Sequence, residues 1–249
     1  MSGSAGGIAA RLEAEREFHD RRFEDGDQRQ DQLKYYWAVE EGSERFASLI
    51  AELAAGADVL EYGCGLGSRA AGLQPVVRSF HAIDISEAAI RQMRATTDAP
   101  NVSFSVMDAM NLDFADASFD LVYGSGIVHH LDTEAYAREV ARVLRPGGTA
   151  LFWEPLGNNP LINAYRALTP DARTPDEHPL VGRDFEIMRR HFQSLDLSLY
   201  GLTTLAAVPL RNGAAGRPLR RALIGLDRML FAIPGVRAMA WYALIRCMR

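Results

Sequence analysis

Short apolar segments alternate with amphipathic segments through the middle of the chain. The apolar segments are typical of buried strands, and they lie at residues 58–62, 79–84, 102–106, 119–123 and 149–153. Amphipathic segments that predict helices lie between them, at residues 69–73, 87–96 and 133–144. Ser86 and Asp132 come directly before two of these helices and are suited to cap them. This alternation predicts an α/β fold, a Rossmann-like parallel sheet with helices on both faces.

The pattern changes on both sides of this alternating region. Residues 11–19 and 32–55 interleave charged and apolar positions and predict N-terminal helices, whereas residues 154–179 are rich in proline and asparagine and predict a loop-and-helix insertion over the carboxyl edge of the sheet. The elements expected after the insertion are a helix at 182–191, a strand at 195–205, a helix at 217–231 and a last strand at 241–245. We therefore divide the chain into a helical segment or lid (1–56), a core (57–154) and a cap with a C-terminal substrate-binding part (155–249).

Composition narrows the class of protein. The chain has 249 residues, of which 48% are hydrophobic and 24% charged, so disordered and fibrous classes are excluded. Cys64 and Cys247 are expected to be reduced thiols. The start of the chain lacks a secretion-signal pattern, and the uncharged run from Leu197 to Leu210 is too short to span a bilayer. We expect a soluble, cytoplasmic protein.

Charge is distributed unevenly along the chain. The net charge is −5, yet the stretch from Arg211 to the end carries eight arginines against one acid, Asp227, which leaves −12 for the rest. Residues 217–231 also place leucines at helical spacing between the arginines. Two interpretations stay open. The helix rests on an anionic membrane or lines the entry for an apolar substrate, or it packs on the sheet with its arginines in solvent.

A glycine-rich turn follows the first predicted strand. Residues 61–67 read Glu-Tyr-Gly-Cys-Gly-Leu-Gly, and glycines at such a turn let the backbone approach a ligand closely while the following helix presents free N–H groups. A dinucleotide fingerprint, G-x-G-x-x-G, counted from Gly63 would need glycine where Ser68 stands. This departure disfavours a nicotinamide-dependent oxidoreductase.

Two further acids end the next two predicted strands. Asp84 ends the second strand, where a carboxylate can accept hydrogen bonds from both hydroxyls of a ribose, and Asp108 ends the third, where it can accept from the amine of adenine. Each acid alone is also explained as a helix cap or a solvated strand end. Together with Glu61, however, they make three acids that each stand at the end of a predicted strand, and this pattern points to an adenosyl group.

These motifs resemble the class I S-adenosylmethionine-dependent methyltransferases of the ubiquinone/menaquinone-type, small-molecule branch. The resemblance is carried by residues 59–67, 82–86, 107–109, 119–132 and 143–148. It implies a seven-stranded sheet whose last strand is antiparallel, with S-adenosylmethionine as the cofactor. It also implies that the glycines line the methionine and ribose, that Asp84 binds the ribose hydroxyls, and that Asp108 and Ala109 bind the adenine.

The N-terminal helix that carries Tyr35, Tyr36 and Trp37 would cover the methionine end of the cofactor, or would pack on the sheet instead. The cofactor site expected from this resemblance comprises Tyr36, Glu61, Gly63, Cys64, Gly65, Gly67, Asp84, Ile85, Asp108, Ala109, Gly124 and Ser125.

Candidate catalytic residues follow the fourth and fifth predicted strands. Methyl transfer needs a nucleophile in line with the departing sulfur, and a general base helps where that nucleophile carries a proton. His129, His130 and Glu154 lie at this edge of the sheet. Adjacent residues of a helical turn point about 100° apart, so at most one histidine should face the cleft, and we prefer His130. Capping and packing also explain both histidines, loop anchoring explains Glu154, and His178 is a further candidate from the cap.

His130 corresponds to the histidine of the E-x-x-E-H metal motif in ubiquinone-pathway O-methyltransferases. Residues 126–130 read Gly-Ile-Val-His-His, so both carboxylates are missing and we expect no metal site.

The sequence favours a small, apolar methyl acceptor. Residues 123–126 lack the Asn/Asp-Pro-Pro-Tyr/Phe box of methyltransferases that act on planar nitrogens, and the body of the chain is acidic, so nucleic acid is not the expected partner. We expect methylation of a carboxylate, phenol or quinone-like molecule on oxygen, with methylation on carbon as a less favoured outcome. The alternative is a protein that binds S-adenosylmethionine but performs other chemistry, such as a cyclase or a scaffold.

Overall fold

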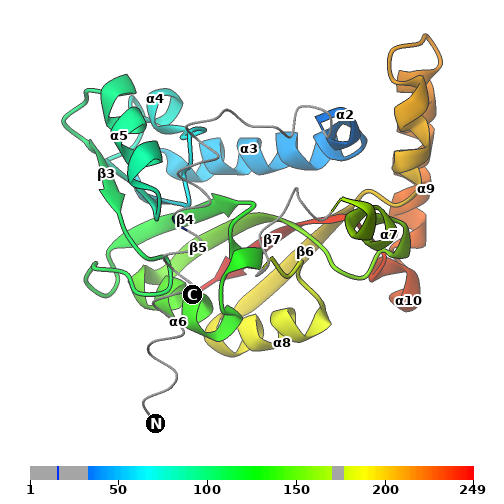
Figure 1. Cartoon of the computed structure of the whole chain (residues 1–249). Coiled ribbons are helices and arrows are strands. Elements are labelled where there is room, and N and C mark those ends of the chain that lie inside the picture. The colour runs from blue at the N-terminus through cyan, green and yellow to red at the C-terminus, as the bar shows by residue number, and fades with distance from the viewer. Residues whose placement is uncertain (1–15, 17–32, 170–176) are drawn as a thin grey trace.

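The computed structural model describes residue 16, residues 33–169 and residues 177–249. Its centre is a seven-stranded sheet with the order β3-β2-β1-β4-β5-β7-β6 (Figure 1). The strands are β1 (Asp58–Tyr62), β2 (Ser79–Asp84), β3 (Val102–Val106), β4 (Phe119–Ser125), β5 (Leu144–Pro155), β6 (Ser194–Tyr200) and β7 (Tyr242–Met248). Strand β7 pairs antiparallel with both β5 and β6, while all the pairs formed among strands β1 to β5 are parallel. The predicted α/β fold and its antiparallel last strand are confirmed.

Helices cover both faces of the sheet because each face of a parallel sheet is apolar. On one face lie α3 (Glu40–Ala54), α4 (Ala70–Leu73) and α5 (Glu87–Thr96), and on the other lie α6 (Thr133–Val143) and α8 (Gly182–His191) (Figure 1). Phe46 and Ile50 of α3 belong to one core cluster, and Tyr136 and Met188 belong to the other.

The predicted helix caps are confirmed. The side chain of Ser86 accepts a hydrogen bond from the backbone N–H of Ala89 at 3.1 Å, and that of Asp132 accepts from Ala135 at 2.9 Å. These two bonds satisfy backbone donors that the first turns of α5 and α6 would otherwise leave without a partner.

The predicted N-terminal helix at residues 32–55 is interrupted. It consists of α2 (Leu33–Tyr36), a 3₁₀ turn η2 (Trp37–Val39) and α3. The tighter turn lets two side chains reach the body of the protein, because Tyr36 stacks on Trp241 and Val39 is only 2% exposed. The other predicted N-terminal helix, at 11–19, lies outside the described residues except for Arg16.

The strand predicted at residues 195–205 is wrong at its end. Strand β6 stops at Tyr200, and Gly201 then adopts a positive φ of 79°, which turns the chain. The rest of the apolar run forms a 3₁₀ helix, η5 (Thr203–Leu210), on which the following helix α9 (Gly216–Leu230) packs. A short helix, α10 (Pro234–Arg237), precedes β7.

The described part of the insertion after β5 contains the helix α7 (Pro160–Leu168), and its last residues lie at the edge of the sheet. Leu156 forms a parallel bridge with Leu180, and the N–H of Gly157 donates to the carbonyl of Leu180 at 2.9 Å. The insertion therefore lies at the carboxyl end of β5, as its composition predicted. Among the described residues, no helix is both long enough and apolar enough to cross a membrane.

Candidate active site

The glycine turn after β1 is held against the end of β2. The N–H groups of Gly63 and Cys64 both donate to the carbonyl of Ile83, at 2.9 and 3.0 Å. Gly63 has a φ of 70° and Gly65 a φ of 47°, so both occupy the left-handed region that favours glycine. A Cβ added at Gly67 would meet nothing within 4 Å, which leaves the outer side of the turn open to a ligand.

The two acids at the ends of β2 and β3 organise the loops around this turn. The Asp84 carboxylate accepts from the N–H of Gly65 at 2.8 Å and from the N–H of Ser86 at 2.9 Å. Asp108 accepts from the N–H of Met110 at 2.8 Å. Both side chains are half-buried, so each keeps oxygen lone pairs accessible at the same edge of the sheet.

Glu61 is a buried residue at the start of the glycine turn. It is 5% exposed, and its carboxylate accepts hydrogen bonds from the Ser68 hydroxyl and from the N–H of Arg69. Burial raises the pKa of Glu61 to about 7, although both hydrogen bonds oppose the shift. Its contacts shape the turn.

Both cysteines are buried and free. Burial raises the pKa of the Cys64 and Cys247 thiols, so both are held as unreactive thiols.

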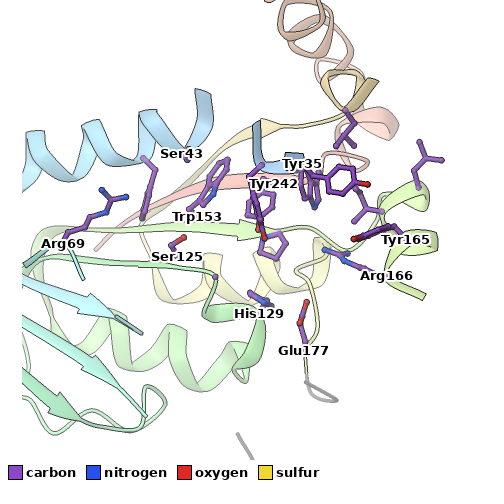
Figure 2. Close-up of a pocket in the computed structure, with 18 residues that line it drawn as sticks. Tyr35, Ser43, Arg69, Ser125, His129, Trp153, Tyr165, Arg166, Glu177 and Tyr242 are labelled. Atoms are coloured by element: carbon purple, nitrogen blue, oxygen red, sulfur yellow. The ribbon is translucent and has the colours of Figure 1, made fainter. Parts of the chain in front are cut away.

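A pocket of ≈ 600 Å³ opens beside the turn, at the carboxyl ends of β4 and β5 (Figure 2). It runs from Arg69 and Ser125 to the insertion, which contributes Tyr165 and Glu177. Of the residues predicted to bind the cofactor, Tyr36 and Ser125 line it, whereas Asp84 and Asp108 do not. The remaining lining residues are Tyr35, Ser43, Phe46, Gly126, His129, Trp153, Pro155, Leu161, Ile162, Arg166, Leu205, Trp241 and Tyr242.

Aromatic side chains form one wall of this pocket. Tyr36 stacks on Trp241 with ring centroids 5.6 Å apart, and Trp153 stacks on Tyr242 at 4.8 Å. Tyr35 meets Tyr165 of α7 at 5.6 Å. Tyr36 of the N-terminal aromatic cluster thus packs on the start of β7, and Tyr35 and Tyr36 line the pocket, while their contact with the methionine end of a cofactor stays a prediction.

His129 is held by a buried carboxylate. Its Nδ1 lies 2.7 Å from an oxygen of Glu154, which is fully buried. The other Glu154 oxygen accepts from the N–H groups of Ile127 and Val128, at 2.9 and 3.1 Å. Because the carboxylate accepts at Nδ1, the proton of the neutral ring is assigned to that nitrogen and the lone pair to Nε2. Glu154 therefore both anchors the loop after β4 and orients the imidazole.

His129, and not the preferred His130, lines the pocket. The two histidines lie in a 3₁₀ turn, η3 (Val128–His130), where Glu154 fixes His129. Their rings stay close, with centroids 4.2 Å apart, so the expected divergence of neighbouring side chains does not occur. His178 is exposed and meets His129 through its backbone N–H, which donates to the His129 carbonyl at 2.9 Å.

Glu177 is the site residue that sequence reasoning missed. One ligand atom from each of His129, His130 and Glu177 lies within 4.8 Å of the others. No local signal marks Glu177, because it reaches the histidines only through the return of the insertion to the edge of the sheet (Figure 2).

Comparison with known proteins agrees with this geometry. Residues 59–148 match the methyltransferase domain family. Over 103 residues the chain is 38% identical to methyltransferase GfsG of Streptomyces halstedii, an alignment that covers 39% of this chain and 37% of that protein. Over 157 residues it is 32% identical to the 27-O-demethylrifamycin SV methyltransferase of Amycolatopsis mediterranei, covering 55% and 54%.

The chain thus spans about half, or less, of the length of these curated relatives. Among solved structures, an S-adenosylmethionine-dependent methyltransferase from Mesorhizobium loti has the same fold, with a TM-score of 0.57 at 17% identity over 83% of this chain and 96% of that one. Residues 59–148 therefore match the methyltransferase domain family, and they lie in a sheet that has the fold of an S-adenosylmethionine-dependent methyltransferase.

Proposed function

We propose that the protein transfers the methyl group of S-adenosylmethionine to an oxygen of a small, apolar molecule. The observation that carries the proposal is the position of the pocket, which starts at Ser125 and Arg69 beside the glycine turn and continues along an aromatic wall to His129. Relatives that share the domain, among them the rifamycin enzyme named above, support oxygen as the acceptor atom.

The residues present fit S-adenosylmethionine. Asp84 and Asp108 offer carboxylate oxygens at neighbouring strand ends, and the open outer side of Gly67 leaves room for the ribose and methionine. We assign the adenosine to this edge, with Ile85, Ala109 and Gly124 beside it, and the methionine end to the part of the pocket between Tyr36 and Ser125. When bound, the cofactor supplies an electrophilic methyl group on a positively charged sulfur.

The chain's own residues position the acceptor and exclude water. Aromatic rings and aliphatic side chains such as Ile162 and Leu205 favour an apolar body, and His129 and Glu177 offer polar groups to one end of it. An acceptor hydroxyl there must lose its proton as its oxygen bonds to the methyl carbon and the carbon–sulfur bond breaks. We assign the acceptor oxygen to the end of the pocket at His129, with Glu154 as the positioning residue for that imidazole.

The experiment that tests this proposal measures binding and turnover separately. We expect calorimetry to detect S-adenosylmethionine binding to the full chain, and Asp84→Ala to weaken it at least about tenfold through loss of a charged acceptor. Glu186→Gln, which changes an exposed carboxylate on α8, is the matched control and should bind normally. Incubation with a panel of acids, phenols and quinones should then release S-adenosylhomocysteine. Tight binding without this product for any acceptor would favour the alternative of a cyclase or scaffold.

We further propose that helix α9 brings the protein to an anionic membrane, from which the apolar acceptor enters. Among the described residues nine large hydrophobic side chains are exposed, and six of them lie between Leu161 and Ile233. Met229 is 67% exposed and Ile233 51%. Only Gly216 and Asp227 are buried within α9.

Two arginines of α9 tie the helix to the protein, since Arg220 pairs with Glu40 and Arg228 with Glu41. Arg217, Arg221 and Arg237 are exposed and form no ion pair with any described residue. Exposed apolar and cationic side chains along α9 and the adjoining residues up to the end of α10 suit the interface of an anionic bilayer. The helix packs on η5, whose Leu205 lines the pocket, so the bound surface would adjoin the acceptor's entry.

Sedimentation with vesicles tests this contact. We expect binding to phosphatidylglycerol-containing vesicles at low salt, little binding to pure phosphatidylcholine, and loss of binding in the Arg217→Gln/Arg221→Gln variant. The Arg189→Gln/Arg190→Gln variant removes the same charge from exposed positions on α8 and should bind normally. Equal sedimentation of the two variants, or none by the unmodified chain, would reject the membrane contact.

A further inference from the structure

We infer that His129, His130 and Glu177 bind one divalent transition-metal ion at the acceptor end of the pocket. The inference deepens the proposed function, because it rests on that function for the role of the ion. Two imidazoles and one carboxylate converge here, with one ligand atom of each within 4.8 Å of the other two. Nitrogen and carboxylate donors in this ratio suit Zn²⁺, Co²⁺, Fe²⁺ or Mn²⁺ and leave coordination positions for other ligands.

The surroundings of His129 are those of a metal-binding histidine. Metal-ligating imidazoles almost always donate their second N–H to a carboxylate or carbonyl, which fixes the ring and makes the coordinating nitrogen more basic. The buried Glu154 carboxylate accepts at Nδ1 of His129 at 2.7 Å, and two backbone N–H groups hold that carboxylate in turn. Because Nδ1 is engaged by Glu154, Nε2 is the ring atom of His129 that we assign to the ion.

The segment that carries Glu177 is fixed to the same turn. The N–H of His178, the next residue, donates to the carbonyl of His129 at 2.9 Å. Two residues further on, the N–H of Leu180 donates to the carbonyl of Pro155, which directly follows Glu154. The backbone on both sides of the cluster is thus tied together, and Glu177 lies near the His129 imidazole (Figure 2).

Methyl transfer from a hydroxyl needs only one proton acceptor, whereas three donor groups meet at this position. A cation would use all three as ligands. The cluster borders the pocket through His129 and Glu177, so an open coordination position would face the acceptor. A divalent ion there lowers the pKa of a hydroxyl that binds to it. The acceptor's O–H then releases its proton to solvent, its oxygen bonds to the methyl carbon, and the carbon–sulfur bond breaks to leave S-adenosylhomocysteine.

Titration of the full chain with Co²⁺ tests the inference, read both by calorimetry and by the visible absorption of the bound ion. We expect one Co²⁺ per chain. Glu177→Gln, which removes only the charge and one donor oxygen, should weaken binding at least about tenfold, and Glu154→Gln should weaken it about 10- to 100-fold through His129.

Glu134→Gln is the matched control, because it disrupts an exposed pair in which His191 Nε2 lies 2.7 Å from the Glu134 carboxylate. It should leave Co²⁺ binding unchanged. The inference is overturned if the unmodified chain binds no Co²⁺, or if Glu177→Gln binds it as tightly as Glu134→Gln does.

Failure of this inference can be told apart from failure of the proposed function. The Co²⁺ titration needs neither cofactor nor acceptor, and S-adenosylmethionine binding to Glu177→Gln should equal that of the unmodified chain, since Glu177 lies at the acceptor end. Release of S-adenosylhomocysteine by a chain that binds no Co²⁺ would reject the metal site and keep methyl transfer. Normal Co²⁺ binding without cofactor binding would reject methyl transfer instead.

Discussion

Ionisation of Glu61 should make the stability of the protein fall as the pH rises. Glu61 is 5% exposed, and burial raises its pKa from an ordinary 4.5 to about 7 in the folded state. Between these two values the folded chain holds a proton that the unfolded chain has released. Folding is therefore favoured at the acidic side of this window, and that contribution is lost as the pH rises through about 7.

The magnitude follows from the size of the shift. One pKa unit corresponds to about 1.4 kcal/mol, so the shift corresponds to a contribution of roughly 3 kcal/mol, of which about 2–3 kcal/mol is lost between pH 5 and pH 8. Glu61→Gln removes the titration while an amide can still accept from the N–H of Arg69 and donate to the Ser68 hydroxyl oxygen. The unfolding free energy of the variant minus that of the unmodified chain should therefore be about 2–3 kcal/mol larger at pH 8 than at pH 5.

Urea unfolding at both pH values measures the effect. The difference in unfolding free energy between variant and unmodified chain cancels the titration of every other group. Glu186→Gln, an exposed carboxylate on α8, is the control and should show the same difference at pH 5 and pH 8. If the difference for Glu61→Gln does not change between the two pH values, Glu61 is ionised in the folded protein at pH 5 and the reasoning is refuted.

Three further substitutions test the packing around the site, each by urea unfolding. Gly63→Ala should cost about 1–3 kcal/mol, because φ is 70° and the new Cβ would lie 2.1 Å from a methyl of Ile127; Gly67→Ala, where a Cβ meets nothing, should cost much less. Asp227→Ala should cost about 2–4 kcal/mol, since the buried carboxylate accepts from the N–H groups of Leu202 and Thr203, and an unchanged unfolding free energy would show that η5 does not depend on it. Phe152→Ala should cost about 3–5 kcal/mol, because the ring is fully buried between Tyr62 and Tyr136; a loss below 1 kcal/mol would mean that the core refills the space.

The regular part of the fold could be predicted from the sequence because local pattern and burial agree there. Strands β1–β4 and helices α5 and α6 begin where an apolar run or a capping residue starts. The prediction was wrong after Tyr200, because an uncharged and largely apolar segment fits a strand or a buried helix equally well. The strand ends where Gly201 adopts a positive φ, at a position where a Cβ would lie 2.6 Å from Val39 and 3.1 Å from Trp241.

The candidate site could be predicted only as far as strand ends determine it. Asp84, Asp108 and Ser125 follow strands, so their common edge was implied by the parallel sheet. The choice between His129 and His130 depended on Glu154 binding one ring, a contact across 25 residues of chain. Glu177 was out of reach for the same reason, because its position is determined by how a proline-rich insertion returns to the sheet.

The aromatic wall has a practical consequence. The chain contains three tryptophans. Trp153 and Trp241 line the pocket, and Trp37 follows Tyr36, with the Arg220 guanidinium 4.6 Å from its ring centroid. Tryptophan emission of the unlabelled protein therefore originates at the pocket or directly beside it, so quenching or a spectral shift can follow the arrival of a candidate molecule without a dye, a radiolabel or a coupled assay.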